Sequence, residues 1–330
     1  MLRQNGRAVL TLAVMALAST AALSTAARAE WPADKPIKMI VPFPAGGGTD
    51  FAGRLVAQHL STRLKANIIV ENRAGANGQV GLRAVKDAAP DGYTLGTASD
   101  GPLIYNHGLY KERLQYNTLK DFAPVGMIMK LPAMIVVHPS VPVKTLAELI
   151  KLAKDKPGEL NYSSPGFGNF GHIATEFFMK GAGIKMTHVP TTGTAPAVQA
   201  VVQGAVQVHL NNLQSLLPQM QGGYVRGLGV AELTRLKNAP DLPPIAETIP
   251  GFDMAAWTAV IAPAGTPPAI IKRLSDELVS ILKEPEVVAL LEKQTTVPWP
   301  MPAEELGKYM AEQIPKWTKI IDDAGIQLKQ

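Results

Sequence analysis

Three short glycine-containing turns hold the residues of this sequence that are best suited to chemistry. They occupy residues 44–50, 163–169 and 190–194, and each is expected to follow a strand and precede a helix. Glycine lets the main chain approach a ligand closely, and the first N–H groups of the next helix have no partner within it. Such N–H groups, at the positive end of a helix dipole, bind anions without lysine or arginine. One such turn could be an ordinary strand–helix connection, but three together indicate an anion site.

Polar side chains beside these turns could add hydrogen bonds. The hydroxyl groups that could donate to an anion belong to Thr49, Ser163, Ser164, Thr192 and Thr194. Either Thr49 or Asp50 is expected to cap the helix that follows the first turn. A buried base is a second possible role for Asp50.

Other reactive groups do not form a recognisable pattern. The chain has no cysteine, which excludes thiol nucleophiles and thiolate metal sites. The histidines show no H-E-x-x-H spacing, so core or surface roles are favoured over metal binding; they are His59, His107, His138, His172, His188 and His209. Ser163 and Ser164 precede His172 without a G-x-S-x-G elbow. We therefore expect no catalytic residue, no metal and no cofactor.

The first turn also has a dinucleotide-binding interpretation. Gly46 and Gly48 follow a strand, and Glu71 ends the next one, as in a Rossmann fingerprint. However, Phe51 occupies the position where a third glycine would allow close helix packing. We therefore favour the anion site.

The elements that position these turns alternate between strand and helix. Strands are predicted at residues 37–43, 67–70 and 93–97, and again at 134–138, 160–162, 187–189 and 205–210. Thr145 and Glu148 have the spacing of a capping box at the start of an intervening helix. The alternation predicts an α/β fold with parallel sheets covered by helices.

The chain is long enough for two lobes. Residues 252–263 are predicted to be extended, and apolar helices follow from Pro267 and over residues 304–322. These helices need a sheet to cover, which the first third of the chain supplies. We predict one lobe from residues 30–130 plus 255–330 and a second from 131–254, with two crossings as a hinge.

The first 29 residues have the composition of an export signal. Arg3 and Arg7 precede an apolar run, and Ala27 and Ala29 match a signal-peptidase site. A membrane anchor is the alternative, but polar residues interrupt the run before the ~20 residues that a span needs. We expect export to the periplasm. The formal net charge of +5 includes three arginines of this segment, and no basic block indicates nucleic-acid binding.

The chain resembles the substrate-binding receptors of tripartite tricarboxylate transporters, the Bug proteins of proteobacterial periplasms. The resemblance covers nearly all of residues 30–330. Its motifs are Ile40-Val-Pro-Phe-Pro-Ala-Gly-Gly-Gly-Thr-Asp50, Glu71-Asn-Arg-Ala-Gly75, Pro90-Asp-Gly-Tyr-Thr-Leu95, Lys120-Asp-Phe-Ala-Pro-Val125, Tyr162-Ser-Ser-Pro-Gly166, His188-Val-Pro190, Pro196-Ala197 and Ala262-Pro-Ala-Gly-Thr-Pro267.

The resemblance implies a type II periplasmic binding protein fold, in which two α/β lobes close on a ligand through a two-strand hinge. It also implies a carboxylate held between the first two glycine turns. The ligand-binding residues carried over in this way are Phe43, Ala45, Gly46, Gly47, Gly48, Thr49, Asp50, Ser99, Asn106, Ser163, Ser164, Gly166, Phe167, Gly168, Asn169, Thr192 and Gly193.

The sequence departs from the family in the second lobe. Many members have Tyr and a basic residue at Thr191 and Thr192, Ser at Asn169 and an Asp near Gln207. The predicted site is therefore less cationic than usual, which favours one carboxylate with a neutral or aromatic remainder, or a dicarboxylate, over citrate. Phe43, Phe167 and Phe170 could flank such a ligand.

The resemblance implies a monomeric transport receptor that delivers its ligand to membrane permease subunits and catalyses no reaction. A sensing module for a membrane kinase would need the same cleft, so the sequence does not separate these two roles. An enzyme is the remaining alternative, and turnover of a bound acid would establish it.

Overall fold

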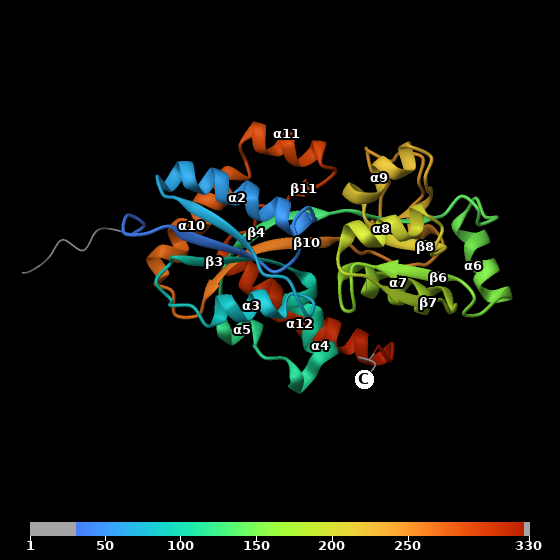
Figure 1. The fold of residues 1–330 in the computed structure, drawn as a ribbon, viewed down its shortest axis with the longest axis horizontal. Coiled ribbons are helices and arrows are strands. Elements are labelled where there is room, and N and C mark those ends of the chain that lie inside the picture. The colour runs from blue at the N-terminus through green and yellow to red at the C-terminus, as the bar shows by residue number, and fades with distance from the viewer. Residues whose placement is uncertain (1–30, 327–330) are drawn as a thin grey trace, which may run out of the picture. The chain divides into compact units, whose positions relative to one another are not determined.

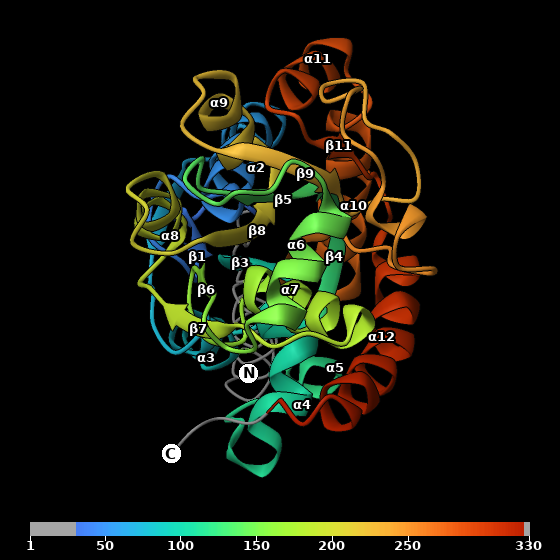
Figure 2. The ribbon, with the colours of Figure 1, turned by 90° about the vertical axis from the view of Figure 1, so that its right-hand side faces the viewer.

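The computed structural model describes residues 31–326. The predicted export signal at residues 1–29 lies outside them. The chain divides into two parts, Met1–Lys35 and Pro36–Gln330. Of the first part only residues 31–35 are described, and they form a turn. Both sheets belong to the second part, whose elements are labelled in Figures 1 and 2.

The first sheet has six strands in the order β11-β4-β10-β3-β1-β2. Their bounds are β1 Ile37–Val41, β2 Ile68–Asn72, β3 Thr94–Ser99, β4 Phe122–Leu131, β10 Ala256–Pro263 and β11 Val297–Pro298. β1 is parallel to β2 and β3, whereas β10 is antiparallel to β3 and β4. The predicted parallel arrangement of the strands at 37–43, 67–70 and 93–97 is confirmed by β1, β2 and β3, but the sheet as a whole is mixed. β4 leaves for the second sheet and β10 returns from it, so these two neighbours run in opposite directions.

Seven α-helices accompany this sheet among the described residues: α2 Gly48–Leu64, α3 Gln79–Lys86, α4 Asn106–Tyr110, α5 Thr118–Asp121, α10 Pro268–Ile281, α11 Pro285–Lys293 and α12 Ala303–Asp323. α2 packs on β1, β2 and β3, while α10 and α12 pack on β4. The apolar stripes responsible have helical spacing: α2 buries Leu55, Val56 and Leu60, and α12 buries Leu306 and Met310.

The second sheet has five strands in the order β7-β6-β8-β5-β9. They are β5 Ala133–Val137, β6 Asn161–Ser164, β7 Thr187–Pro190, β8 Val208–Asn212 and β9 Arg226–Val230. β6 is parallel to β7 and β8, but β5 is antiparallel to β8 and β9. Four α-helices belong to this lobe among residues 31–326: α6 Leu146–Asp155, α7 Phe170–Ala182, α8 Thr194–Val202 and α9 Leu213–Gln221.

The predicted capping box at the start of α6 is confirmed. The Glu148 amide donates to Thr145 Oγ1 at 3.2 Å, and the Thr145 amide donates to Glu148 Oε2 at 3.2 Å. Leu146 and Leu149 are buried, so they form the inward face of α6.

Two segments connect the sheets. One is residues 131–133, between β4 and β5, and the other is residues 231–255, between β9 and β10. The Ala231 amide donates to the Ala133 carbonyl at 2.9 Å, and the Met254 amide donates to the Ala231 carbonyl at 2.9 Å. These bonds tie the crossings together as a two-strand hinge between two α/β lobes. The exact lobe boundaries at residues 130–131 and 254–255 stay a prediction.

Some elements have no counterpart in the sequence prediction. β4 was not predicted because Pro124 and Gly126 interrupt its apolar pattern, and its pairing with β10 is irregular between Val260 and Ile261. A π-helix at Gly101–Tyr105 that leads into α4 was also missed. α10 begins one residue later than expected, with Pro268 as its first residue.

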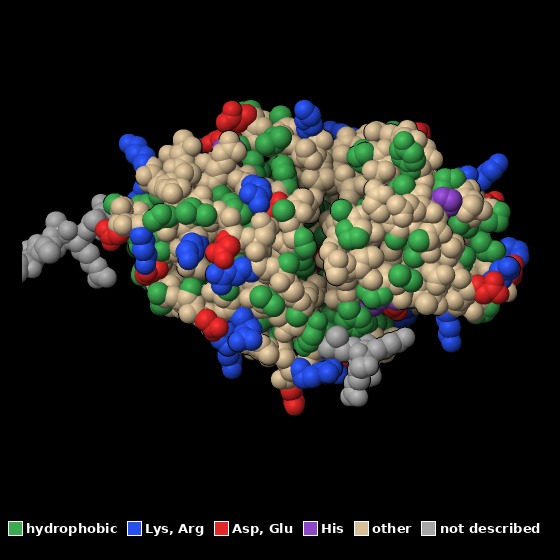
Figure 3. Space-filling model, in the orientation of Figure 1, with side chains coloured by type: hydrophobic (Ala, Val, Ile, Leu, Met, Phe, Trp, Pro, Cys, Tyr) green, Lys and Arg blue, Asp and Glu red, His purple; other side chains and the backbone are tan. Residues whose placement is uncertain are grey.

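Within residues 31–326, no helix is long and apolar enough to cross a membrane. On the face in Figure 3, basic and acidic side chains are interspersed, without a broad area of a single sign.

Thr145→Ala should lower the free energy of unfolding by about 1 kcal/mol, because it removes the hydroxyl that accepts from the Glu148 amide. Urea unfolding measures this loss. Thr62→Ala is the control, since Thr62 is exposed within α2 and does not cap a helix. An equal loss in both variants would contradict the capping role.

Candidate functional site

A cavity of about 280 Å³ lies between the two lobes. The first lobe contributes the loop after β1, the end of β3 and the start of β10. The second lobe contributes the loops before α7 and α8 and the end of β8. Because strand ends and helix starts from both lobes meet here, the cavity has the location that open α/β sheets use for ligands.

Ten predicted site residues line this cavity. They are Phe43, Ala45, Gly46, Gly47, Gly48, Thr49, Ser99, Asn169, Thr192 and Gly193. The structure therefore brings the first and third glycine turns together on opposite sides of one space.

The other seven predicted residues lie outside the wall of the cavity. They are Asp50, Asn106, Ser163, Ser164, Gly166, Phe167 and Gly168. Most of the second glycine turn is therefore set back from the cavity.

The first glycine turn is held in place by the side chains of Asp50 and Asn72. The Gly46 amide donates to Asp50 Oδ2 at 3.0 Å, and Asn72 Nδ2 donates to the Phe43 carbonyl at 3.0 Å. Asn72 Nδ2 also donates to Asp50 Oδ1 at 2.8 Å, so the two side chains that hold the turn are bonded to each other. Arg54 Nε donates to the same carboxylate at 3.0 and 3.1 Å. Side chains behind the turn thus fix its main chain.

Asp50 does not cap α2, contrary to expectation. The N-cap of α2 is Gly47 and no side chain caps the helix, so Thr49 and Asp50 both lie in its first turn. Burial acts to raise the pKa of Asp50, but hydrogen bonds from Arg54, Asn72 and Gly46 outweigh it and the pKa is lowered. Asp50 is therefore a paired carboxylate that positions the turn, and the role of a buried base does not fit it.

The second glycine turn satisfies its own main chain. The Gly166 amide donates to Ser164 Oγ at 3.3 Å and the Gly168 amide to His172 Nδ1 at 3.2 Å. Asn169 caps α7, because its Oδ1 accepts from the Gly171 amide at 3.2 Å. These N–H groups are already used, so this turn contributes fewer free donors than its glycine content suggested.

Stacked rings support this second turn from behind. Phe167 packs on His172 with ring centroids 4.5 Å apart, His172 stacks on His188 at 4.3 Å, and His188 stacks on Tyr162 at 4.8 Å. Burial and the neighbouring His188 lower the pKa of His172 to about 3, so this ring is neutral. Phe167 belongs to this stack, which leaves Phe43 and Phe170 as the expected aromatic residues that line the cavity.

The third glycine turn faces the first across the cavity. Gly193 is the N-cap of α8, and Thr194, Ala195 and Pro196 continue the wall. A Cβ at Gly193 would lie 3.6 Å from Pro44 Cγ, and a Cβ at Gly47 would lie 3.8 Å from Thr194 Oγ1. The starts of α2 and α8 therefore approach one another from opposite lobes.

Asn106 and Gly168 form a contact between the lobes. Asn106 is fully buried and its Oδ1 accepts from Asn77 Nδ2 at 2.8 Å. A Cβ at Gly168 would lie 2.8 Å from Asn77 Nδ2 and 2.7 Å from Leu109 Cδ1. Gly168 also has a φ of +76°, which disfavours other residues. The absence of a side chain at Gly168 therefore allows the two lobes to come into close contact.

Several wall residues were not predicted. Those with polar or large side chains are Asp100, Asn211, Asn212, Trp257 and Thr258. Asn211 and Asn212 end β8, so the rule that ligands bind at the carboxyl ends of strands could have found them. Trp257 and Thr258 lie on β10, which enters from the hinge, and no sequence pattern marks this strand as part of a site.

The electrostatic character of the cavity is set by one acid. Its described wall contains no lysine, arginine or histidine, and Asp100 is its one acidic residue. Burial raises the pKa of Asp100 to about 7, although the hydroxyl groups of Tyr105 and Ser99 and the Gly101 amide oppose the rise. An anion in this cavity therefore relies on main-chain and neutral polar donors.

Comparison with known proteins identifies the family. Residues 52–326 match the sequence model of the tripartite tricarboxylate transporter family receptor. The protein BugT of Bordetella pertussis is 32% identical over 313 residues, which are 94% of this chain and 96% of BugT. The chain belongs to this receptor family.

Two solved structures share the fold of this receptor. Rpa4515 of R. palustris, solved with adipate, is 32% identical, with a TM-score of 0.86 over 91% of this chain and 100% of that one. MatC of Rhodopseudomonas palustris, with bound malate, is 29% identical, with a TM-score of 0.82 over 88% and 99%. The two-lobed periplasmic binding protein fold is thereby confirmed. The family consists of periplasmic solute receptors that work with tripartite transporters, and they are not enzymes.

A buried serine–histidine pair in this receptor is structural. Ser163 Oγ lies 2.9 Å from His209 Nδ1 and donates to the Ala197 carbonyl at 2.8 Å. Both side chains are fully buried, and burial lowers the pKa of His209 to about 4. A nucleophile sealed from the cavity has no access to substrate, so this pair anchors β6 to β8.

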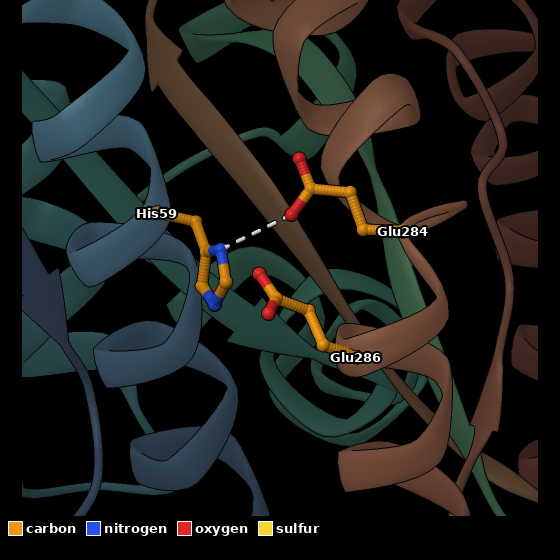
Figure 4. A group of neighbouring side chains, drawn as sticks. All are labelled: His59, Glu284 and Glu286. Atoms are coloured by element: carbon orange, nitrogen blue, oxygen red, sulfur yellow. Dashed lines mark ion pairs between the residues drawn. The ribbon is translucent and has the colours of Figure 1, made fainter.

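His59, Glu284 and Glu286 form the one metal-like cluster among the described residues (Figure 4). Their potential ligand atoms lie within 4.8 Å of one another, and His59 Nδ1 is 3.5 Å from Glu284 Oε2. The Arg63 guanidinium, however, forms an ion pair with Glu284. This arginine already supplies the positive charge that a metal would bring, and we assign no metal to the cluster.

Asp50→Ala should lower ligand affinity about tenfold and the free energy of unfolding by about 1–3 kcal/mol, because the Gly46 amide loses its buried acceptor. Titration calorimetry and urea unfolding measure these effects. Asp276→Ala is the control, since its ion pair with Lys272 has the same spacing but is exposed.

The stabilisation of the folded protein by Asp50 is expected to decrease as the pH falls. The folded-state pKa is lowered, so the stabilisation is present above the unfolded value of about 4 and is lost as the pH falls through the folded value. A difference between wild type and Asp50→Ala that grew on acidification would contradict this assignment.

Gly168→Ala should hinder closure of the lobes and weaken ligand binding about tenfold or more, because the added Cβ would meet Leu109 Cδ1 at 2.7 Å. Gly158→Ala is a matched control. Gly158 has a similar φ of +81°, but its Cβ would meet nothing within 4 Å. Calorimetry gives the affinities and X-ray scattering the degree of closure. Equal affinities in the two variants would show that backbone strain, not the lobe contact, matters.

Proposed function

We propose that this chain is a periplasmic receptor that captures a small carboxylate between its lobes and delivers it to a tripartite tricarboxylate-type transporter. One observation carries the proposal: the main chain at the starts of α2 and α8, from opposite lobes, lines a single cavity without any lysine or arginine in its described wall.

Helix geometry supplies the donors for a carboxylate. With Gly47 as the N-cap of α2, the amides of Gly48 and Thr49 have no partner within the helix. With Gly193 as the N-cap of α8, the same holds for Thr194 and Ala195. Each helix dipole adds about 0.3–1 kcal/mol for a nearby negative charge. Four main-chain donors from two lobes are sufficient to bind both oxygens of one carboxylate.

The charge of Asp50 does not cancel this attraction. Although Asp50 lies in the first turn of α2, its carboxylate is paired with Arg54 and its Oδ2 accepts from the Gly46 amide. The Gly48 and Thr49 amides are not used by it.

The remainder of the cavity favours a small ligand. A volume of about 280 Å³ and walls that include Phe43, Phe170 and Trp257 suit a monocarboxylate with an aliphatic or aromatic remainder, or a short dicarboxylate. The structures of relatives with adipate and malate support this size class. Citrate fits less well, because no basic side chain lines the described wall to balance its additional charges.

Ligand binding is coupled to closure because few side-chain hydrogen bonds join the lobes among residues 31–326. One of them lies outside the wall of the cavity: Gln214 Nε2 on α9 donates to Gln294 Oε1 after α11 at 3.0 Å. A carboxylate that accepts from both α2 and α8 adds bonds that only the closed form can make, and so shifts the population toward it. We propose that this closed form, acting as a monomer, is what the permease subunits recognise.

Deletion of the gene tests the transporter role. Loss of uptake of the bound acid, with its transcriptional response intact, would support delivery to a permease. Retained uptake with a lost response would instead favour a sensing module.

Gly47→Val should abolish carboxylate binding, with affinity reduced about a hundredfold or more. Gly47 has a φ of −90° and a ψ of 170°, which valine readily adopts, so the fold should persist while the side chain occupies the cavity. Calorimetry against benzoate, hexanoate, succinate, adipate, malate and citrate measures this. Gly307→Val on α12, away from the cavity, is the control. Unchanged affinity in Gly47→Val would show that the site is misplaced.

A further inference from the structure

Asp100 is a buried carboxylic acid in the wall of the cavity. It follows β3 directly and only 1% of its surface is exposed. Its Oδ1 accepts from the Gly101 amide at 3.0 Å. The hydroxyl groups of Tyr105 and Ser99 also interact with this carboxyl group, but no group among the described residues reaches its buried Oδ2 with the geometry of a full hydrogen bond. A buried oxygen with no partner carries a desolvation penalty that a ligand donor would relieve.

Three neighbouring wall residues also have unused hydrogen-bonding atoms. Asn211 Oδ1 accepts from the Asn212 amide at 2.8 Å, which leaves Asn211 Nδ2 as an unused donor. Asn212 Oδ1 is an unused acceptor and Thr258 Oγ1 is an unused hydroxyl among the described residues. These side chains come from both lobes. Together with Asp100 Oδ2 they offer two acceptors, one donor and one hydroxyl.

We propose that the second polar group of the bound carboxylate is a hydrogen-bond donor, a hydroxyl or an ammonium, and that Asp100 is the residue that selects it. This inference rests on the proposed function, in which the main chain of the glycine turns holds the first carboxylate. Asp100 Oδ2 and Asn212 Oδ1 are then the acceptors in the rest of the wall that a donor on the ligand would satisfy.

Within the size class proposed above, these residues favour acids with a donor group over the short dicarboxylates. A second carboxylate would place negative charge near Asp100 in a cavity whose described wall contains no lysine, arginine or histidine. Like charges in a site of low polarity repel strongly unless one is protonated. An ammonium gains from this arrangement, and a hydroxyl satisfies Oδ2 without a charge penalty.

The ionisation of Asp100 should make the ligand affinity depend on pH. Burial raises its pKa to about 7. The titratable side chains that interact with it are Tyr105 and Tyr309. Burial raises the pKa of both, that of Tyr309 to about 12, so both stay neutral near pH 7. Of these three groups, Asp100 is the one whose ionisation changes between about pH 6 and pH 8. Burial also raises the pKa of Glu232, in the hinge, to about 8, so the pH response of the ω-amino acid is compared with that of the unsubstituted acid, which shares any effect of Glu232.

The experiment compares acids that differ only at one end. The six-carbon set is hexanoate, ω-hydroxyhexanoate, ω-aminohexanoate and adipate, and the four-carbon set is butanoate, ω-hydroxybutanoate, ω-aminobutanoate and succinate. Calorimetry on the full chain at about pH 6 and about pH 8 gives each affinity. Neither the ω-amino group nor the first carboxylate titrates in this interval.

We expect the ω-hydroxy or the ω-amino acid to bind at least about tenfold more tightly than both the unsubstituted acid and the dicarboxylate. Binding of the ω-amino acid should tighten from pH 6 to pH 8, because the carboxylate form of Asp100 attracts the ammonium. The ω-hydroxy acid should show a weaker pH response. Tighter binding of the ω-hydroxy acid would indicate a neutral donor, and tighter binding of the ω-amino acid would indicate a cation.

Asp100→Asn should reduce the ω-amino acid affinity at least about tenfold, remove its pH dependence and improve binding of the dicarboxylate. Asparagine has the same shape and can keep the bond from the Gly101 amide. Asp276→Asn, on the exposed face of α10, should change none of these values. The wild-type comparison at two pH values needs no variant, so it tests the inference even if Asp100→Asn fails to fold.

Two results would overturn the inference. One is a dicarboxylate that binds most tightly to the wild type and tightens as the pH falls, because Asp100 would then donate a proton to a second carboxylate. The other is an unchanged ranking in a folded Asp100→Asn variant. Failure of every acid to bind the wild type would instead contradict the carboxylate receptor itself.

Discussion

The conformation of the first glycine turn is the constraint on which the site depends. Asp50 accepts a hydrogen bond from the Gly46 amide, and Asn72 donates one to the Phe43 carbonyl and another to Asp50. The first amides of α2 have no partner within the helix. If these side chains did not hold the turn, its glycines would populate many conformations and the entropic cost of binding would rise. In the proposed function, this rigid, pre-oriented main chain is what binds an anion without a basic side chain.

The lobes contribute unequally to this arrangement. α2 and α8 supply unused amides, whereas the turn before α7 uses its amides internally and rests on the ring stack of Phe167, His172 and His188. The second turn therefore serves as a firm surface against which the first lobe closes, with Gly168 placed against Leu109 and Asn77. Two similar glycine motifs in the sequence thus have different functions in the folded protein.

The sequence predicted the general architecture and about half of the cavity wall. Glycine turns between strands and helices led to Gly47 and Gly193, which line the cavity, because local chain geometry alone determines such turns. The sequence did not reveal that the amides of Gly166 and Gly168 donate to side chains of their own lobe. These bonds depend on where the fold places Ser164 and His172. Asp100 and Thr258 were missed for a related reason: their role arises only when β10 returns through the hinge and lies antiparallel to β3.

A crystal structure of the receptor with a bound carboxylate tests the central claim most directly. The account predicts that both carboxylate oxygens lie within about 3.2 Å of main-chain nitrogens at the start of α2 and at the start of α8. A carboxylate bound instead by a lysine or arginine side chain, or by one lobe alone, would contradict it.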